Sequence, residues 1–177
     1  LAFTPAESAN EFAALTTDWT LQPQAAGDLG ARMQSYFDQA FEVGCTRIVL
    51  LGTDSPNLPR AYVEQAFNLL NSHDLVLGPT TDGGYYLIGQ RRRMVGLFND
   101  VRWSSPAVLA QTLANAETLG LSAGQLAAWY DVDELADLVQ LRADLSTATD
   151  PALLELRALI DRKVPNLNLR SNSGGEA

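Results

Sequence analysis

The sequence predicts an α/β fold with a largely parallel sheet, and three observations support this. Short apolar runs alternate along the chain with stretches that have helical periodicity, which is the pattern of strand–helix–strand units. The segment 47–52 contains a continuous apolar run after Arg47, as is typical of a strand buried on both faces. The chain has 177 residues, 46% hydrophobic and 19% charged, which is enough for one domain with a sizeable core.

Composition excludes several kinds of chemistry. Cys45 and His73 are the single residues of their types, so an internal disulfide and a His/Cys zinc cluster are excluded. The net charge of -9 argues against nucleic acid or an anionic membrane as the main partner. No apolar run reaches the ~20 residues of a membrane span, and no signal peptide opens the chain, so we expect a cytoplasmic protein. A catalytic or binding site in this chain would therefore consist of carboxylates, hydroxyls, backbone amides and Arg side chains.

Each element has its own local signal. Asp28 can cap a helix that ends at Gly44, and Pro59 opens a helix that reaches about residue 72. Ser105-Pro106 and Asp150-Pro151 each combine a cap with a first-turn proline, and Asp133 can cap a helix that runs to about 145. The other expected elements are a strand end at 1–3, a helix over 6–16, strands at 74–78 and 85–89, and a patternless tail over 166–177.

The first candidate loop, 52–59, directly follows the buried strand. Strand carboxyl ends form the ligand crevice in open α/β sheets, and a carboxylate there suits a hard divalent cation such as Mg²⁺ or Mn²⁺. Asp54 is therefore a candidate metal ligand. An equally favoured interpretation is that Asp54 only caps the turn before Ser55-Pro56.

The second candidate loop joins the strands at 74–78 and 85–89. Asp82, Gly83, Gly84 and Tyr85 follow one another there, and paired glycines allow a ligand to approach backbone amides closely. Asp-Gly is also the strongest short hairpin signal, so a plain hairpin is the alternative. The density of special residues favours a loop that contacts substrate.

The third candidate is the pair Asp131 and Asp133. Side chains two residues apart in an extended segment point the same way, so both carboxylates could share a cation with Asp54. Capping is the alternative and, for Asp133 taken alone, the favoured one.

Two smaller segments are candidates for substrate binding. Asp28, Gly30 and Arg32 stand at a helix N-terminus, where free amides and an Arg could meet a phosphate; a plain capped helix is the simpler interpretation. Trp103 and Ser104 precede another helix, and the indole could pack on a sugar or base, although core packing is the usual fate of a Trp.

Together and in this order, these motifs resemble a bacterial GT-A-type glycosyltransferase family, described as radical-SAM/selenodomain-associated, with some members described as arsenosugar-biosynthesis glycosyltransferases. That family is similar to the wider nucleotide-diphospho-sugar transferase superfamily. The match spans about residues 1–145, and its most specific part is Asp82-Gly83-Gly84-Tyr85-Tyr86-Leu87-Ile88-Gly89. The other matching motifs are Gly27-Asp28-Leu29-Gly30, Gly52-Thr53-Asp54-Ser55-Pro56, Trp103-Ser104-Ser105-Pro106 and Asp131-Val132-Asp133.

The resemblance implies a Rossmann-like α/β/α sandwich that transfers a sugar from a nucleotide-activated donor to a small-molecule acceptor with Mg²⁺ or Mn²⁺. Asp54 would be the chief metal ligand and catalytic carboxylate, with Asp131 or Asp133 as the second ligand. Asp82 would be a second catalytic carboxylate and would shape the sugar or acceptor side with the Gly83-Gly84-Tyr85 turn. The segment from Asp28 to Arg32 would lie near the nucleotide.

The sequence departs from the family at its start, because the family's first strand and basic nucleotide loop have no counterpart before Leu1. We therefore expect one incomplete domain over 1–163 and a flexible tail over 164–177. Two alternative functions stay open: a nucleotidyltransferase that makes an activated metabolite, and a non-catalytic nucleotide-binding relative or inactive fragment.

Overall fold

The computed structural model describes residues 1–16, 18–165 and 167. The strands are β1 (Ala2–Phe3), β2 (Gln22–Pro23), β3 (Ile48–Leu51), β4 (Leu75–Pro79), β5 (Tyr85–Gln90) and β6 (Ala123–Gln125). The helices are η1 (Ala6–Ser8), α1 (Ala9–Leu15), α2 (Leu29–Glu42), α3 (Arg60–Leu69), α4 (Val108–Thr118), α5 (Leu135–Asp144), η2 (Leu145–Thr147) and α6 (Pro151–Lys163). The tail predicted for 166–177 lies outside the described residues except for Leu167.

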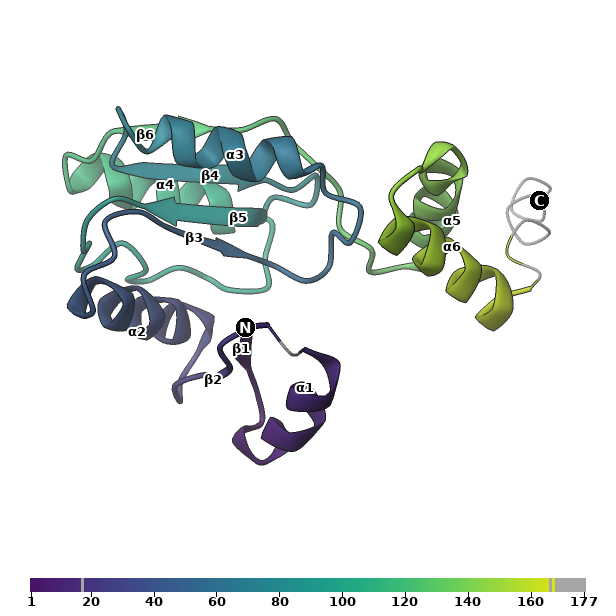
Figure 1. Ribbon diagram of the computed structural model, residues 1–177. Coiled ribbons are helices and arrows are strands. Elements are labelled where there is room, and N and C mark those ends of the chain that lie inside the picture. Colours follow the sequence, from purple (N-terminus) through teal and green to yellow (C-terminus); the bar gives the residue numbers. More distant parts are fainter. Residues whose placement is uncertain (17, 166, 168–177) are drawn as a thin grey trace.

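The main sheet has four strands in the order β3-β5-β4-β6 and is mixed, not largely parallel. β5 runs antiparallel to both β3 and β4, while β6 runs parallel to β4. The prediction of a largely parallel sheet was therefore wrong for β5, because β4 and β5 form a hairpin closed by residues 80–84. β1 and β2 pair in parallel as a separate two-stranded sheet, which lies beside α2 in Figure 1.

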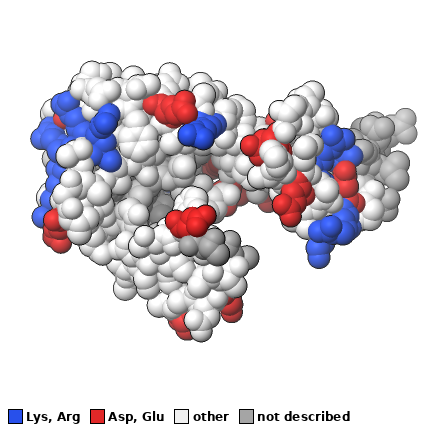
Figure 2. All heavy atoms as spheres, in the orientation of Figure 1, with Lys and Arg blue, Asp and Glu red and all other residues white. Residues whose placement is uncertain are grey.

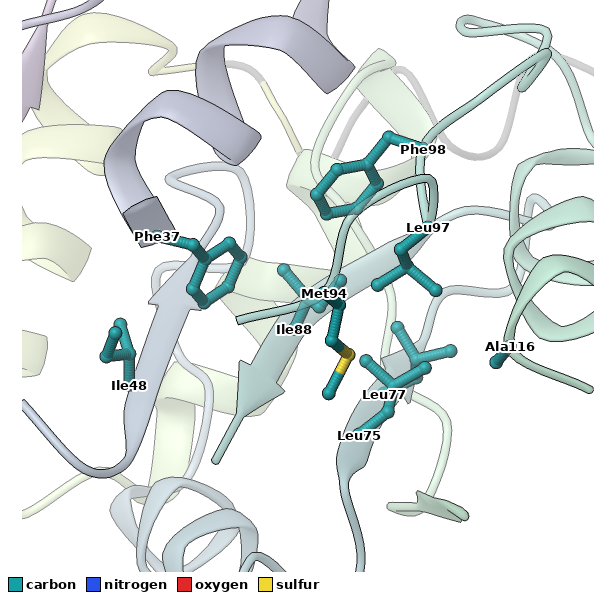
Figure 3. Close-up of a cluster of buried hydrophobic side chains, with 9 residues drawn as sticks. All are labelled: Phe37, Ile48, Leu75, Leu77, Ile88, Met94, Leu97, Phe98 and Ala116. Carbon is teal, nitrogen blue, oxygen red and sulfur yellow. The ribbon is translucent and has the colours of Figure 1, made fainter. Parts of the chain in front are cut away.

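Helices cover both faces of the main sheet, which gives three layers (Figure 1). Alternate residues of β4 face opposite sides: Leu77 packs with Phe37 of α2 and Ala116 of α4, whereas Val76 packs with Ala66 of α3. Figure 3 shows the first cluster, which comprises Phe37, Ile48, Leu75, Leu77, Ile88, Met94, Leu97, Phe98 and Ala116. Each fully buried Leu or Phe in it contributes about 1.5–3 kcal/mol to stability.

The last two helices form a small unit of their own beyond the sheet (Figure 1). α5 and α6 enclose a separate cluster of Leu141, Leu145 and Ile160 with Leu167. The predicted cap of α6 is confirmed, because Asp150 accepts hydrogen bonds from the Ala152 and Leu153 amides. The predicted cap of α5 was one residue too early: Glu134, not Asp133, is the N-cap, in a capping box with Asp137.

Candidate functional site

The carboxyl ends of three strands meet at one rim of the main sheet. β4 and β6 are parallel, and β3 has the same direction because both β3 and β4 are antiparallel to β5. The loop 52–59 follows β3, the loop 80–84 follows β4, and the segment 126–134 follows β6. All three candidate loops therefore lie along this rim, which in Figure 1 faces α5 and α6.

Direct hydrogen bonds join the first and third loops. The Val132 amide donates to the Asp54 carbonyl oxygen at 2.8 Å. The Ser55 hydroxyl lies 2.8 Å from Asp131 Oδ1 and 3.0 Å from the Tyr130 carbonyl oxygen, within donating distance of both. Ser55 is only 8% exposed, so this contact is sealed beneath the rim. The structure thus brings the loops of Asp54 and Asp131 together on one rim, and a cation shared by the two carboxylates stays a prediction.

The electrostatics of the rim centre on Asp131. Burial raises the pKa of the Asp131 carboxyl, and the negative charges of Asp82, Asp133 and Asp54 raise it further, while the Ser55 hydrogen bond lowers it. Carboxylates from three loops therefore act on Asp131. No salt bridge to any of these four acids is found in the described part of the chain, and hydrogen bonds stabilise the carboxylates of Asp131 and Asp82.

Asp82 is the most constrained acid of the rim. Its Oδ1 accepts hydrogen bonds from the Thr80 hydroxyl and, at 3.0 Å, from the Gly84 amide. These two hydrogen bonds, the Thr80 bond first, lower the pKa of Asp82, so the carboxylate is ionised at neutral pH and a weak base. The loop is a hairpin, as the alternative interpretation predicted, and it also lies on the rim. Contact of this loop with substrate stays a prediction.

Gly83 is required where the hairpin loop meets the segment before α4. Its φ is +94°, and a Cβ there would lie 2.2 Å from the Pro106 carbonyl oxygen. The Leu109 amide also donates to the Gly83 carbonyl oxygen at 2.9 Å. These contacts fix Ser104 and its neighbours beside the Asp82 turn; Ser104 itself has a φ of +57°.

The two aromatic candidates have core positions. The Trp103 ring packs on Phe98, with centroids 6.1 Å apart, and a Cβ at Gly30 would lie 2.7 Å from the Trp103 ring. The Tyr85 hydroxyl is buried, and burial raises its pKa. A bulge at Gly78/Pro79 accompanies the turn of Tyr85 into the cluster between the sheet and α2 and α4. The Tyr85 hydroxyl therefore points into the core and does not face the rim, while contact of substrate with the rest of Tyr85 stays a prediction.

The helix-start candidates have structural partners. Asp28 caps α2 by accepting from the Ala31 amide at 2.9 Å, as the simpler interpretation predicted. Arg32 donates to the Gly27 carbonyl oxygen at 3.0 Å and to Gln24 Oε1 at 3.3 Å. Gly30 is buried beneath Trp103. These three residues stabilise the start of α2. Arg32 is in none of the ion pairs found among the described residues.

A divalent cation fits this rim only with help from a ligand. Within residues 1–16, 18–165 and 167, no group of three or more Asp, Glu, His or Cys side chains is placed to hold a metal ion. Mg²⁺ is usually bound by one or two carboxylates and completed by substrate phosphates. Asp54 and Asp131, with their uncompensated charge, match that partial donor set. The described helices also include none that is long and apolar enough to cross a membrane.

Sequence reasoning missed two contributors to this rim. Ser55 connects the loops, and its position between an Asp and a Pro at a strand end was the signal that could have found it. Trp129 extends β6 toward the rim, since its amide donates to the Pro79 carbonyl oxygen at 3.0 Å. No local pattern marks that pairing.

Comparison with known proteins identifies the family. The family model described as "Uncharacterized protein conserved in bacteria (DUF2064)" matches residues 1–105. The chain belongs to DUF2064. The matched residues of this DUF2064 protein include the loops with Asp54 and Asp82 and the Trp103 segment, but not Asp131.

One solved structure is similar over most of the chain. It is a crystal structure at 1.90 Å of a Desulfovibrio desulfuricans G20 protein that is provisionally assigned as a nucleotide-diphospho-sugar transferase. The two chains are 32% identical, with a TM-score of 0.81, and the alignment covers 92% of this chain and 74% of the other. No curated protein matches this DUF2064 chain. The mixed α/β fold is thus that of the Desulfovibrio protein.

Proposed function

We propose that this protein is a metal-dependent glycosyltransferase that uses a nucleotide-activated sugar. The observation that carries the proposal is that two rim loops, each after one of two parallel strands, are hydrogen-bonded to each other. Ser55 bonds to Asp131, and the Val132 amide bonds to the Asp54 carbonyl oxygen. Similarity to a provisionally assigned nucleotide-diphospho-sugar transferase supports the same chemistry.

The charge of the rim explains why a cation and a diphosphate would bind there together. The carboxylates of Asp54 and Asp131 would hold Mg²⁺ or Mn²⁺, and the donor's phosphates would complete its coordination. The bound metal ion would supply charge neutralisation for the leaving diphosphate. Without a cation, four carboxylates would repel the phosphates.

The chain's own groups would then position the reaction. Ser55 holds the Asp131 side chain in place, and the Gly83–Pro106 contact fixes the turn of Asp82 next to it. In the transfer, the acceptor oxygen or nitrogen forms a bond to the anomeric carbon while that carbon's bond to the diphosphate oxygen breaks. The nucleoside diphosphate leaves with the electron pair, and the acceptor proton passes to a carboxylate of the rim or to water.

The test offers the protein two kinds of substrate with Mg²⁺. One set of reactions contains nucleotide sugars, and the other contains nucleoside triphosphates with a sugar phosphate or another phosphorylated acceptor. Phosphorus NMR distinguishes the products. We expect nucleoside diphosphate from a nucleotide sugar and no pyrophosphate from a triphosphate. Pyrophosphate release with the triphosphates alone would make the protein a nucleotidyltransferase, and binding without turnover in either set would make it a non-catalytic relative.

A further inference from the structure

A cavity of about 310 Å³ lies between the rim and the α5–α6 helices. The sheet side contributes Asn57 and Trp129, and the helical side contributes Asp144, Leu145, Thr147, Ala148 and Leu153. The cavity therefore lies at the junction that Figure 1 shows between the sheet and the last two helices. None of its lining residues is a rim carboxylate.

A chain of hydrogen bonds fixes the polar wall of the cavity. The Trp129 indole donates to Asn57 Oδ1 at 3.2 Å, and Asn57 Nδ2 donates to the Tyr130 hydroxyl at 2.6 Å. The Tyr130 hydroxyl donates to Asp144 Oδ2 at 2.6 Å, and Gln140 donates to Asp144 Oδ1 at 2.9 Å. The indole N–H and the phenol O–H are thus used within the wall. The Asp144 carboxylate oxygens still have lone pairs to offer, because each can accept more than one hydrogen bond.

The charge and polarity of the lining select a ligand class. The lining residues include no Lys or Arg, and Asp144 is their one charged group. A carboxylate or phosphate would meet repulsion there, whereas a hydroxyl or an ammonium group can donate to Asp144. Leu145, Ala148 and Leu153 provide an apolar surface opposite Trp129. The matching ligand therefore carries a hydrogen-bond donor on an apolar body.

The cavity is continuous in sequence with the candidate reaction site. Asn57 stands three residues after Asp54 in one rim loop, and Trp129 stands two residues before Asp131 in the other. The Ser55–Asp131 and Asn57–Trp129 hydrogen bonds join the same two loops. A molecule in the cavity would consequently lie beside a donor bound at the rim.

We propose that this cavity binds the acceptor of the transferred sugar, and that the acceptor is an alcohol or amine on a small apolar body. The role of the bound molecule as an acceptor rests on the proposed function. The binding site and its preference for uncharged or cationic donors rest on the cavity alone. An alcohol or amine is also the nucleophile that glycosyl transfer needs.

Three probes of nearly equal size test the ligand class: 2-phenylethylamine, 2-phenylethanol and phenylacetate. Their binding is followed by 1H–15N NMR shifts at Thr147, Ala148 and the Trp129 indole. We expect the amine and the alcohol to shift these signals at millimolar concentration, and phenylacetate to bind at least about tenfold more weakly. Equal or tighter binding of phenylacetate would overturn the assignment.

Two variants test the location. Ala148→Phe should fill the cavity and abolish probe binding, whereas Ala143→Phe, at an exposed position of α5 outside the lining, should not. Asp144→Asn should weaken binding of the amine by only about threefold, because Asp144 is exposed and its charge is screened. Binding of the alcohol should stay unchanged. If Ala148→Phe fails to fold, the difference between amine and alcohol in Asp144→Asn decides; no difference would refute the cavity as the site.

Turnover separates this inference from the proposed function. If nucleotide sugars are turned over and Ala148→Phe changes neither kcat nor KM for the acceptor, the acceptor role is wrong while the proposed function stands. If no nucleotide sugar is turned over but the probes bind as expected, the proposed function and the acceptor role fail together, and the cavity remains a site for alcohols and amines.

Discussion

The two ends of the main sheet both carry buried or half-buried carboxylates, but they treat them in opposite ways. At the end where β4 begins, Asp74 accepts hydrogen bonds from the amide and hydroxyl of Ser122 and pairs with Arg91 and Arg92 at 2.9–3.0 Å. At the other end, Asp131 has Ser55 as its hydrogen-bond partner and three acids around it. Figure 2 shows basic side chains, which are arginines, gathered at the first end, on the left of the view.

This difference separates stability from binding. The Ser122 amide, and then the Arg92, Ser122 and Arg91 side chains, hold the pKa of Asp74 far below its usual range in spite of burial. The carboxylate is therefore stabilised in the folded state. The pKa of Asp131 is instead raised, so its ionised form is disfavoured in the folded chain. The first end, with paired charges, stabilises the fold, and the second end, without ion pairs among the described residues, is the one where we propose that a ligand binds.

The largest expected effect follows from removing a rim carboxylate. Asp54→Ala or Asp131→Asn should lower metal-dependent transfer at least about a thousandfold, or about 4 kcal/mol, because the cation loses one of its few protein ligands. Calorimetric titration of Mg²⁺ with nucleotide should show the same loss, while thermal unfolding stays close to that of the parent. Glu117→Ala, an exposed acid of α4, is the control. Unchanged metal affinity in Asp54→Ala would contradict the assignment.

The next effect concerns Asp74, at the opposite end. Asp74→Asn should lower the free energy of unfolding by about 2–4 kcal/mol, because two arginines lose the carboxylate that a largely buried site provides. Denaturant unfolding measures it, and metal binding should not change.

The matched control for Asp74 is the exposed pair Arg60–Glu64, whose side chains are 92% and 64% exposed. Glu64→Gln should change stability by no more than about 0.5 kcal/mol. Equal losses of stability in Asp74→Asn and Glu64→Gln would show that burial does not distinguish these pairs.

The contribution of Asp74 to stability also depends on pH. Since the folded pKa of Asp74 is depressed, this contribution is present above the unfolded pKa of 3.8 and is lost as the pH falls through the folded pKa.

Gly83→Ala should have a smaller effect on stability, about 1–3 kcal/mol, with a measurable loss of transfer. The substitution both forces a residue with a Cβ to a φ of +94° and drives that Cβ into the Pro106 carbonyl oxygen. Gly120→Ala is the matched control, because Gly120 has a φ of +64° and open space around its missing Cβ. If the two variants unfold at the same denaturant concentration, the contact with Pro106 contributes nothing.

The smallest expected effect is the pH dependence that Asp131 confers. Its folded pKa lies above the unfolded value of 3.8, so the folded state binds the proton more readily, and stability from this group rises as the pH falls toward 3.8. Comparing unfolding of the parent and Asp131→Asn from pH 7 to pH 4 should show a relative gain for the parent of less than about 1 kcal/mol. Saturating Mg²⁺ with nucleotide should remove that gain. A relative loss for the parent on acidification would reverse the sign of the argument.

The elements that the sequence predicted well are those with a local cause. Asp28 and Asp150 cap their helices as expected, because an N-cap acts on amides two or three residues away. The apolar run also predicted the strand β3, but β3 is an edge strand in which Ile48 alone is buried, so the expectation of burial on both faces was wrong. Asp133 was given the cap that Glu134 holds, since the two acids are adjacent and the capping box with Asp137 decides between them.

What the sequence did not reveal depends on distant partners. The antiparallel direction of β5 depends on how the chain returns after β4, and β6 is three residues, Ala123–Gln125, without an apolar run. The candidate acids were identifiable by type, yet their contacts were not: Ser55 and Asp131 meet only because β6 pairs with β4. The burial of the Tyr85 hydroxyl was missed for the same reason, since a bulge accompanies its turn from one face to the other.

The hydrogen bond between Ser55 and Asp131 also has a kinetic consequence. The two residues are 76 positions apart, so this contact closes one of the longer loops of the chain. Closing such a loop reduces the conformational entropy of the chain before any contact compensates for the loss, so distant pairings form slowly. The main hairpin, β4 with β5, needs only the turn 80–84 and can form early. We therefore expect the chain to gain its sheet first and the contacts of its carboxylate rim last, so that a refolding protein passes through a compact state in which Ser55 and Asp131 have not yet met.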